Sequence, residues 1–278
     1  MAAHTPSQDR DDIKHHYDVG DEFYRLWLDE RMIYSCAYFQ TGKETIHAAQ
    51  RAKLDYICRK LRLQPGERLL DIGCGWGGLI LHAAQHYGVH AIGITLSDNQ
   101  LALANQRIQE AGLNGRVEAL LLDYRDAPQR FGDASFDKIS SIGMFEHVGQ
   151  TNFSAYFGVV RRMLRDRGLF LNHGITSPDA NGRTVGSGIS VFMDTYVFPH
   201  TELPHLHLVI REMAAQNFEV CDVESLRPHY ARTLAQWSHR LEAQLDAARR
   251  LVGDKTLRIW RAYLAGSSVG FAQGDRKS

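Results

Sequence analysis

The chain has 278 residues, 44% of them hydrophobic, which is enough for the core of one large α/β domain. Basic and acidic residues number 32 each, so no excess of positive charge indicates a nucleic-acid partner. No apolar run approaches the roughly 18 residues of a membrane-spanning helix, and the polar N-terminus excludes a secretory signal peptide. Four scattered cysteines without a C-x-x-C pair predict a reducing cytoplasm, and fourteen histidines without metal-ligand spacing predict no metal site.

The predicted elements follow a polar tail, residues 1–13, which we expect to be disordered. Helices are expected at 21–28 and 45–61, because their apolar residues recur at helical spacing. Strands and helices then alternate in the βαβ rhythm of a parallel sheet. The strands are expected at 67–72, 89–95, 116–121, 136–143 and 168–175, and the helices between them at 79–87, 98–111 and 152–165. A last strand is predicted at 218–225 and a long helix at 230–252.

One segment, 177–205, interrupts this rhythm. It begins with polar and small residues and continues into the apolar run 191–198. A segment of this length between elements is usually functional or disordered, and its aromatic residues favour order. Two interpretations stay open: a lid over the site, or a short helix that packs against the core.

The most informative stretch is Asp71-Ile-Gly-Cys-Gly-Trp-Gly-Gly78, between a predicted strand and a predicted helix. Its glycines let the backbone approach a ligand that a Cβ would exclude, and the helix N-terminus presents unpaired N–H groups. The spacing is G-x-G-x-G, not the G-x-G-x-x-G of pyrophosphate binders. Strand, acid, turn and helix in this order predict a site for a nucleotide-type ligand, with a purely structural turn as the alternative.

Polar residues also follow the other predicted strands, at the edge where open α/β sheets bind ligands. Thr95 ends the second strand, and Asp98 is predicted to cap the next helix. Asp123-Tyr-Arg-Asp126 follows the third strand, either beside an adenine ring or as a simple turn. Glu146 follows the fourth strand and His173 ends the fifth. A carboxylate and an imidazole on neighbouring strand ends are candidates for acid–base chemistry.

Seven motifs occur in chain order. They are His16-Tyr-Asp-Val-Gly, Tyr34-Ser-Cys-Ala-Tyr-Phe, Leu70-Asp-Ile-Gly-Cys-Gly-Trp-Gly, Gly93-Ile-Thr-Leu-Ser, Asp123-Tyr-Arg-Asp, Phe145-Glu-His-Val-Gly and Pro228-His-Tyr-Ala-Arg-Thr-Leu. Together they resemble the cyclopropane-fatty-acid synthase family, which includes the mycolic acid cyclopropane synthases. The resemblance covers about residues 14–273. It implies a Rossmann-like class I fold of methyltransferases that use S-adenosylmethionine (SAM): one domain at 14–278, a mostly parallel seven-stranded sheet, and helical additions that form a lid.

The family transfers a methyl group from SAM to a cis double bond of an acyl chain and then closes a three-membered ring. The resemblance therefore implies a cyclopropane-fatty-acyl-phospholipid synthase, with SAM and a bicarbonate ion as cofactors. It implies an unsaturated acyl lipid as substrate, transient contact with a membrane surface, and no nucleic-acid partner. The expected location is the cytoplasm; attachment to the inner membrane face and a homodimer stay open.

The resemblance also carries site residues onto this chain. In the family a bound bicarbonate is the base. It would be held here by backbone groups of Cys36 and Ile175 and by the side chains of Glu146, His173 and Tyr230. The contacts to SAM would come from Tyr34, Ser35, Asp71, Gly73, Gly75, Thr95, Leu96, Gln100, Tyr124, Arg125 and Ile142.

Two departures from the family leave the acyl carrier and the membrane docking open. Many bacterial members have another domain where this chain has little before residue 14, and the family usually continues beyond Gly270-Phe-Ala-Gln-Gly. Three alternatives remain: methylation of a small amine, as in plant benzylisoquinoline N-methyltransferases, methyl-branched products, and a non-catalytic lipid- or SAM-binding module. The complete set of five base-site residues favours acyl-chain chemistry.

Overall fold

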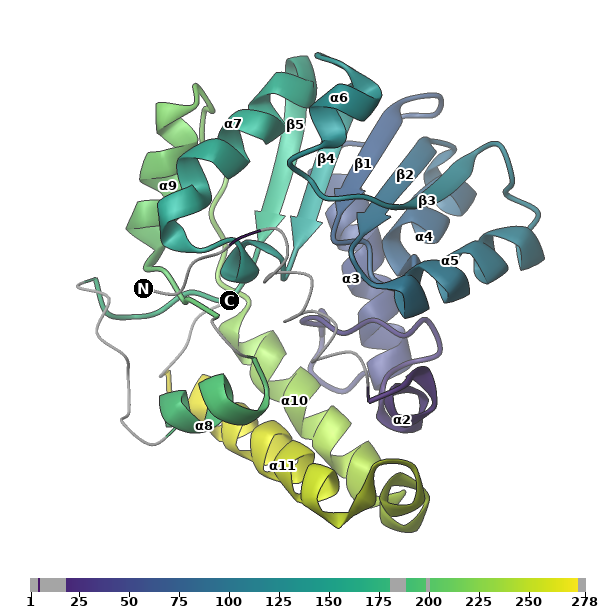
Figure 1. Cartoon of the computed structure of the whole chain (residues 1–278), viewed down its shortest axis with the longest axis vertical. Helices are drawn as coiled ribbons and strands as arrows, with labels where there is room; N and C mark the ends of the chain where they lie inside the picture. The colour runs from purple at the N-terminus through teal and green to yellow at the C-terminus, as the bar shows by residue number, and fades with distance from the viewer. Residues whose placement is uncertain (1–4, 6–18, 181–188, 199–200, 275–278) are drawn as a thin grey trace.

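The computed structural model describes residues 5, 19–180, 189–198 and 201–274, so the predicted tail lies outside the described residues apart from Thr5. The centre of the molecule is a parallel sheet with the strand order β3-β2-β1-β4-β5 (Figure 1). The strands are β1 (Arg68–Ile72), β2 (His90–Thr95), β3 (Val117–Leu121), β4 (Phe136–Ile142) and β5 (Leu164–His173). The chain order reverses between β1 and β4, and the crevice at such a point is where open α/β sheets bind ligands.

Helices cover both faces of the sheet, because each strand sends successive side chains to opposite sides. Leu69 and Leu70, neighbours on β1, accordingly lie in two different cores. The helices in the core of Leu69 are α3 (Ile46–Lys60), α4 (Gly78–Tyr87) and α5 (Asp98–Glu110). The helices in the core of Leu70 are α6 (Ala127–Phe131), α7 (Phe153–Met163) and α9 (Leu206–Ala215).

A third group of helices lies beyond the carboxyl ends of the strands (Figure 1). These helices are α2 (Asp21–Trp27), α8 (Ile189–Tyr196), α10 (Arg227–Glu242) and α11 (Leu245–Gln273). They share a core of buried aromatic side chains, among them Trp27, Trp237 and Phe271. This aromatic core therefore covers the carboxyl ends of the strands, where the predicted site residues lie.

The predicted strand at 218–225 is wrong, and the described residues hold five strands where the resemblance implied seven. Val220 and Val223 are 42% and 52% exposed, and their odd spacing would place them on opposite faces of a strand. The carboxylate of Glu224 instead accepts a hydrogen bond from Tyr56 Oη (2.7 Å) and pairs with Lys60 Nζ (2.8 Å). At the start of the segment, Phe218 packs against Phe170 of β5 with ring centres 5.6 Å apart, and beyond it polar contacts with α3 hold the chain without strand pairing.

The single helix predicted at 230–252 is also wrong, because the chain turns at Ala243 and Gln244. Gln244 N donates to Leu241 O (3.0 Å), which ends α10. No glycine or proline marks this turn, so the apolar periodicity continued across it. A second break follows at Gly253, whose φ/ψ angles of +73° and 169° are non-helical within α11. The residues after Gly253 run back along α10, where Arg261 binds Glu242 and Ser268 Oγ donates to Ala231 O.

The insertion 177–205 is closed at its base, where Ser177 N donates to Pro204 O (2.9 Å). Within it, α8 buries Met193, and the following Val197 is also buried in the aromatic core. The described residues thus fit the expected short packing helix. The lid interpretation stays a prediction.

Candidate active site

The turn between β1 and α4 needs glycine for its backbone. Gly73, Gly75 and Gly77 have φ angles of +80°, +54° and +83°, in the left-handed region that residues with a Cβ rarely adopt. Gly73 N and Cys74 N both donate to Ile94 O (2.9 and 3.0 Å), which ties the turn to β2. A Cβ at Gly75 would meet no protein atom within 4 Å. The glycines therefore serve the geometry of the turn, whether or not they also admit a ligand.

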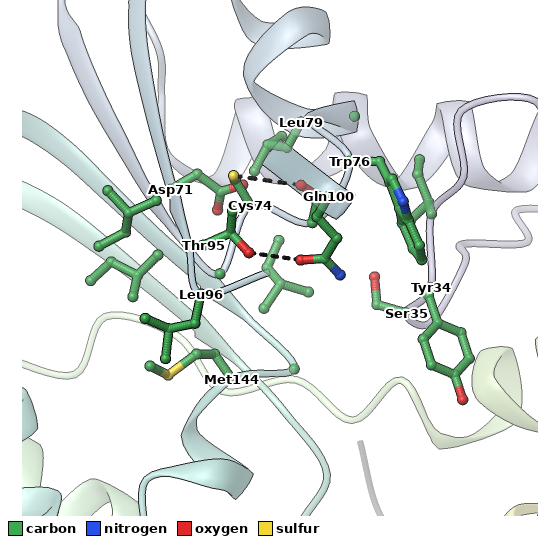
Figure 2. A pocket seen from close by; sticks show the side chains of 18 of the residues that line it. Tyr34, Ser35, Asp71, Cys74, Trp76, Leu79, Thr95, Leu96, Gln100 and Met144 are labelled. Carbon is green, nitrogen blue, oxygen red and sulfur yellow. Dashed lines mark hydrogen bonds between the residues drawn. The ribbon is translucent and has the colours of Figure 1, made fainter. Parts of the chain in front are cut away.

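A pocket opens at this turn, beside the point where the strand order reverses. All eleven residues expected to contact the cofactor line it: Tyr34, Ser35, Asp71, Gly73, Gly75, Thr95, Leu96, Gln100, Tyr124, Arg125 and Ile142. Figure 2 shows Tyr34 and Ser35 on one side of the pocket and Asp71, Thr95 and Leu96 on the other. The fold has brought these distant positions together, and their binding roles stay a prediction.

Asp71 places a buried negative charge in the pocket. Its side chain is 4% exposed, and burial raises its pKa to about 6. Ser140 Oγ donates to Asp71 Oδ1 (2.7 Å) and opposes that rise in pKa. The two residues are direct partners in the β1–β4 register, so the sheet sets this contact. At neutral pH the carboxylate form predominates, and it suits a cationic group of a ligand.

Thr95 and Gln100 form a polar pair on the wall of the pocket. Thr95 Oγ1 donates to Gln100 Oε1 (2.7 Å), and the Gln100 amide points toward Ser35 (Figure 2). The expectation that Asp98 caps α5 is wrong. Ser97 has the extended backbone of an N-cap residue, and its Oγ accepts from Gln100 N (3.3 Å).

Asp123 shapes the turn after β3. Its Oδ1 accepts hydrogen bonds from Arg125 N and Arg125 Nε, both at 2.9 Å, which supports the turn interpretation of this acid. The Arg125 guanidinium lies 5.1 Å from the centre of the buried Tyr124 ring. An aromatic face and a planar cation thus line the pocket where an adenine was expected.

Glu146 is buried in a short 3-10 helix, η1 (Phe145–His147), directly after β4. Its Oε1 accepts from Ile175 N (2.8 Å), whereas its Oε2 has no hydrogen-bond partner in the described part of the chain. Burial raises the pKa of Glu146 to about 7. A Cβ at Gly174 would overlap the Phe145 ring and come within 2.8 Å of Oε2, so glycine there makes room for the carboxyl group. This carboxyl group can exchange a proton near neutral pH.

His173 stands at the end of β5, where its register partner on β4 is Ile142. The neighbouring strand ends expected for Glu146 and His173 are therefore confirmed. Burial and then the charge of Lys53 lower the pKa of His173 to about 4, so the imidazole is neutral at pH 7. A neutral imidazole both donates and accepts a hydrogen bond.

The segment that contains Cys36 is bound to α10, the helix that carries Tyr230. Ala37 N donates to Thr233 Oγ1 (3.0 Å), which fixes the segment after Tyr34 against the helix that carries Tyr230. Cys36 and Tyr230 are both buried in the aromatic core, and Ile175 packs against it. The Cys36 thiol lies 3.3 Å from Ala37 O, in keeping with a small buried side chain. Ile175 thus connects Glu146 with the core that holds Cys36 and Tyr230, although its N–H already serves Glu146. The roles of the five base-site residues stay a prediction.

The sequence matches the mycolic acid cyclopropane synthetase family over residues 4–277. The chain belongs to this family. It is an enzyme of the SAM-dependent methyltransferase class that is related to the cyclopropane synthases.

Relatives and a solved structure agree with this family membership. A probable fatty acid methyltransferase of Pseudomonas putida is 51% identical over 98% of this chain and 68% of its own length. Cyclopropane mycolic acid synthase 1 of Mycobacterium tuberculosis is 37% identical over 94% of this chain and 92% of that protein. The crystal structure of mycolic acid cyclopropane synthase CmaA1 with SAH and CTAB has a TM-score of 0.88 and 35% identity, over 96% of this chain and 95% of that one.

The chain is shorter than several of these relatives. It spans 68%, 62% and 53% of the length of three curated family members. The structural likeness confirms the Rossmann-like class I methyltransferase fold that the sequence predicted. Among the described residues, no helix is long and apolar enough to cross a bilayer. Membrane contact, the homodimer and the cytoplasmic location stay predictions.

Two buried polar residues of α3 support the site of this family member and were not predicted. Gln50 Nε2 donates to Ile33 O and Ser35 O (3.3 and 2.9 Å), and Lys53 Nζ donates to Ser35 Oγ (2.9 Å). The signal was present in the sequence: Lys53 comes four residues after Ala49, on the apolar stripe of the helix. A lysine on a buried stripe indicates a polar partner inside the protein.

Proposed function

We propose that this chain transfers a methyl group from SAM to the cis double bond of an unsaturated acyl chain and closes a cyclopropane ring. Family membership supports the use of SAM, and the pocket at the glycine turn offers it a site. SAM supplies an electrophilic methyl group on a sulfonium. The chain's own residues must hold that methyl in line with the alkene, keep water out and remove one proton.

The pocket suits the polar parts of SAM. The buried carboxylate of Asp71 matches a cationic group, and the Gln100 amide and Ser35 hydroxyl offer polar contacts. Tyr124 and Arg125 provide a flat surface for a purine. These residue types fit an adenosine linked to an amino acid.

One observation carries the choice of an apolar substrate: Tyr34 belongs both to the pocket and to the aromatic core. It lines the pocket, and its ring centre lies 5.3 Å from that of Trp237 and 5.5 Å from that of Trp27. The same core contains Tyr230 and Phe271, whose ring centres are 4.5 Å apart. An alkyl chain that reaches the donor methyl would therefore run along aromatic side chains.

Aromatic surroundings suit the chemistry of an alkene. The π electrons of the double bond form a C–C bond to the methyl as the C–S bond breaks, and the acyl chain is left with a carbocation. Aromatic faces stabilise such a cation through their negative quadrupole. A base then removes a proton from the delivered methyl group, and the electrons of that C–H bond form the C–C bond that closes the ring. The products are an acyl cyclopropane and S-adenosylhomocysteine (SAH).

The proton must leave through a base in a dry site, and the family pattern assigns Glu146 to the site of that base. Its unpartnered Oε2 is an acceptor that fits the O–H of a bicarbonate ion. We place bicarbonate at this point, held by Glu146, His173 and Tyr230, where it would supply a small base. The Ile175 N–H is engaged by Glu146 at 2.8 Å, so a contact from Ile175 to the ion would have to be shared.

The test is an assay on lipid vesicles. Purified chain with SAM and vesicles of a cis-unsaturated phospholipid should yield acyl chains that gain one CH2 and lose the double bond, as mass spectrometry and ozonolysis detect. A gain of CH2 with the double bond retained would indicate a methyl-branched product. Methylation of small amines without any change in the lipid would replace the proposal with the amine alternative.

A matched variant separates chemistry from binding. Glu146→Gln keeps the shape of the side chain and removes its charge. We expect it to abolish most lipid turnover while SAH affinity, measured by calorimetry, stays within a few-fold. Full activity in that variant would remove Glu146 from the mechanism.

A further inference from the structure

Lys53 is a buried cation on α3 with few partners. Its side chain is 3% exposed, and it lines the pocket. Its one hydrogen bond in the described part of the chain goes from Nζ to Ser35 Oγ (2.9 Å), and no carboxylate there forms an ion pair with it. An ammonium group has three protons to donate, and a buried charge without an anion is costly. The site therefore calls for an anionic oxygen from a ligand.

Asp71 supplies the opposite charge in the same pocket. Its hydrogen bond comes from Ser140, and it makes no ion pair with Lys53 within 4.0 Å. The two charges are close enough to influence each other, because Asp71 acts to raise the pKa of Lys53 and Lys53 to lower that of Asp71. An acid and a base that line one pocket without touching leave room for a ligand that carries both charges.

We propose that Lys53 binds the carboxylate of the amino-acid end of SAM, while Asp71 faces its ammonium group. This inference rests on the proposed use of SAM and adds a residue of α3 to the binding site. Ser35, which Lys53 holds by its hydroxyl, would lie beside the same carboxylate. Gln50 supports this arrangement from one turn earlier on α3, since it donates to Ser35 O.

The charge state of Lys53 agrees with this role. Burial lowers its pKa to about 8, and nearby Cys36, Asp29 and Asp71 act in the opposite direction. The ammonium form still predominates at neutral pH. A bound carboxylate would stabilise that form further.

A bicarbonate ion carries the same carboxylate chemistry and is the other source of an anion. Lys53 also lowers the pKa of His173, so its charge is felt at the candidate base site. The direct hydrogen bond to Ser35, a residue of the pocket wall, favours the amino-acid end of SAM. The experiment must therefore distinguish the two anions.

The experiment compares SAH with its decarboxylated analogue, which keeps the ammonium group and lacks only the carboxylate. Calorimetry measures both ligands on the wild type and on Lys53→Met, which keeps the length and loses the charge. We expect SAH affinity to fall by about 10- to 100-fold, as removal of a charge-assisted hydrogen bond typically does. Affinity for the analogue should change little, which a general disturbance of the pocket would not produce.

Lys138→Met is the matched control. Lys138 is also buried, 8% exposed, but its Nζ lies 3.5 Å from Glu67 Oε1 near the start of β4, remote from the carboxyl ends of the strands. In Lys138→Met, the ratio of the affinity for SAH to the affinity for the decarboxylated analogue should equal the ratio in the wild type.

Three results would overturn the inference. Equal losses for both ligands in Lys53→Met would assign the lysine a structural role. Unchanged SAH affinity with a higher bicarbonate requirement in turnover would indicate that Lys53 binds bicarbonate. Unchanged SAH affinity and an unchanged bicarbonate requirement would indicate that Lys53 binds neither anion. A selective loss of SAH affinity in Lys53→Met, with a wild type that does not modify lipid, would contradict the proposed reaction and leave the role of Lys53 standing.

Discussion

Burial shifts the pKa values of single residues in this site, and these shifts set what the residues can do chemically. Glu146 keeps one carboxyl oxygen unpartnered among the described residues, and its pKa rises to about 7. His173 is buried and neutral at pH 7. A carboxyl group and an imidazole that differ this much in proton affinity from their exposed forms are suited to proton transfer.

Tyr230→Phe should slow turnover and leave SAH affinity unchanged. Tyr230 is buried on α10, and by family resemblance its hydroxyl donates to the bound base. Loss of one such donor costs about 1–3 kcal/mol, which is roughly ten- to a hundredfold in rate. Steady-state kinetics and calorimetry measure the two effects. Tyr87→Phe removes a half-buried hydroxyl contact, to Asp55 of α3, and should leave turnover intact. An equal loss of turnover there would assign the effect to stability.

Glu146 should also make stability depend on pH. Its pKa in the folded chain lies above the ordinary value of 4.5, so the folded state binds the proton more tightly. That contribution is present below pH 4.5 and is lost as the pH rises through about 7. Glu146→Gln should therefore gain about 2 kcal/mol in free energy of unfolding, relative to the wild type, between pH 5 and pH 8. Urea unfolding at the two pH values measures this difference, and an equal offset at both would contradict the shifted pKa.

Elements of the fold meet at the base site and set its shape. The strand end of β5 brings Gly174 and Ile175 against Glu146. The end of the insertion also takes part, since Glu202 N donates to Glu146 O (3.1 Å) and Glu202 Oε2 accepts from Gln150 N (2.7 Å). The end of β5 and the end of the insertion therefore fix the short helix η1 in place.

Gly174→Ala should disrupt this junction. The new Cβ would overlap Phe145 and approach Glu146 Oε2 to 2.8 Å, so the turn must move. We expect a loss of about 1–3 kcal/mol in free energy of unfolding and a strong loss of turnover. Gly266→Ala in α11 is the control, because its Cβ would meet nothing within 4 Å, and alanine there should stabilise the helix by up to about 1 kcal/mol. Normal turnover in Gly174→Ala would contradict this prediction, because it would show that the position of η1 does not matter for catalysis.

The whole molecule forms its pocket from distant parts of the chain. Ser35 comes from the segment before α3, Asp71 from β1 and Ile142 from β4, while α3 holds Ser35 in place. The aromatic core beyond the strand ends is continuous with this pocket through Tyr34. A ligand in the pocket therefore contacts the sheet and the segment before α3 at once.

Ligand binding should stabilise the whole fold. A ligand that binds only the folded chain adds about 2.7 kcal/mol to the free energy of unfolding at a hundred times its Kd. SAH should therefore raise the unfolding midpoint of the wild type in a concentration-dependent way, as differential scanning fluorimetry measures. Adenosine alone should raise it less, because it lacks the amino-acid end; equal shifts would argue that Lys53 and Asp71 touch no ligand.

Much of the fold follows from local patterns. The five strands, the glycine turn after Asp71 and the polar residues at strand ends were predictable, because alternation and glycine spacing act within a few residues. Parallel strands then place their carboxyl ends at one edge, which brings Thr95, Glu146 and His173 to the same side. The pocket could be predicted in this way before its geometry was known.

Other features depend on contacts between distant segments. The later part of α11 packs back on α10 after the turn at Ala243 and the break at Gly253, and Lys60 and Tyr56 of α3 bind the acids of residues 218–225. The pKa of Glu146 depends on burial, and the role of Lys53 depends on a serine eighteen positions earlier in the chain. Sequence by itself determined which residues stand at the strand ends, since that is a local property. Tertiary structure decided which charges are buried and which partners they lack, because burial and pairing are set by segments far apart in the chain.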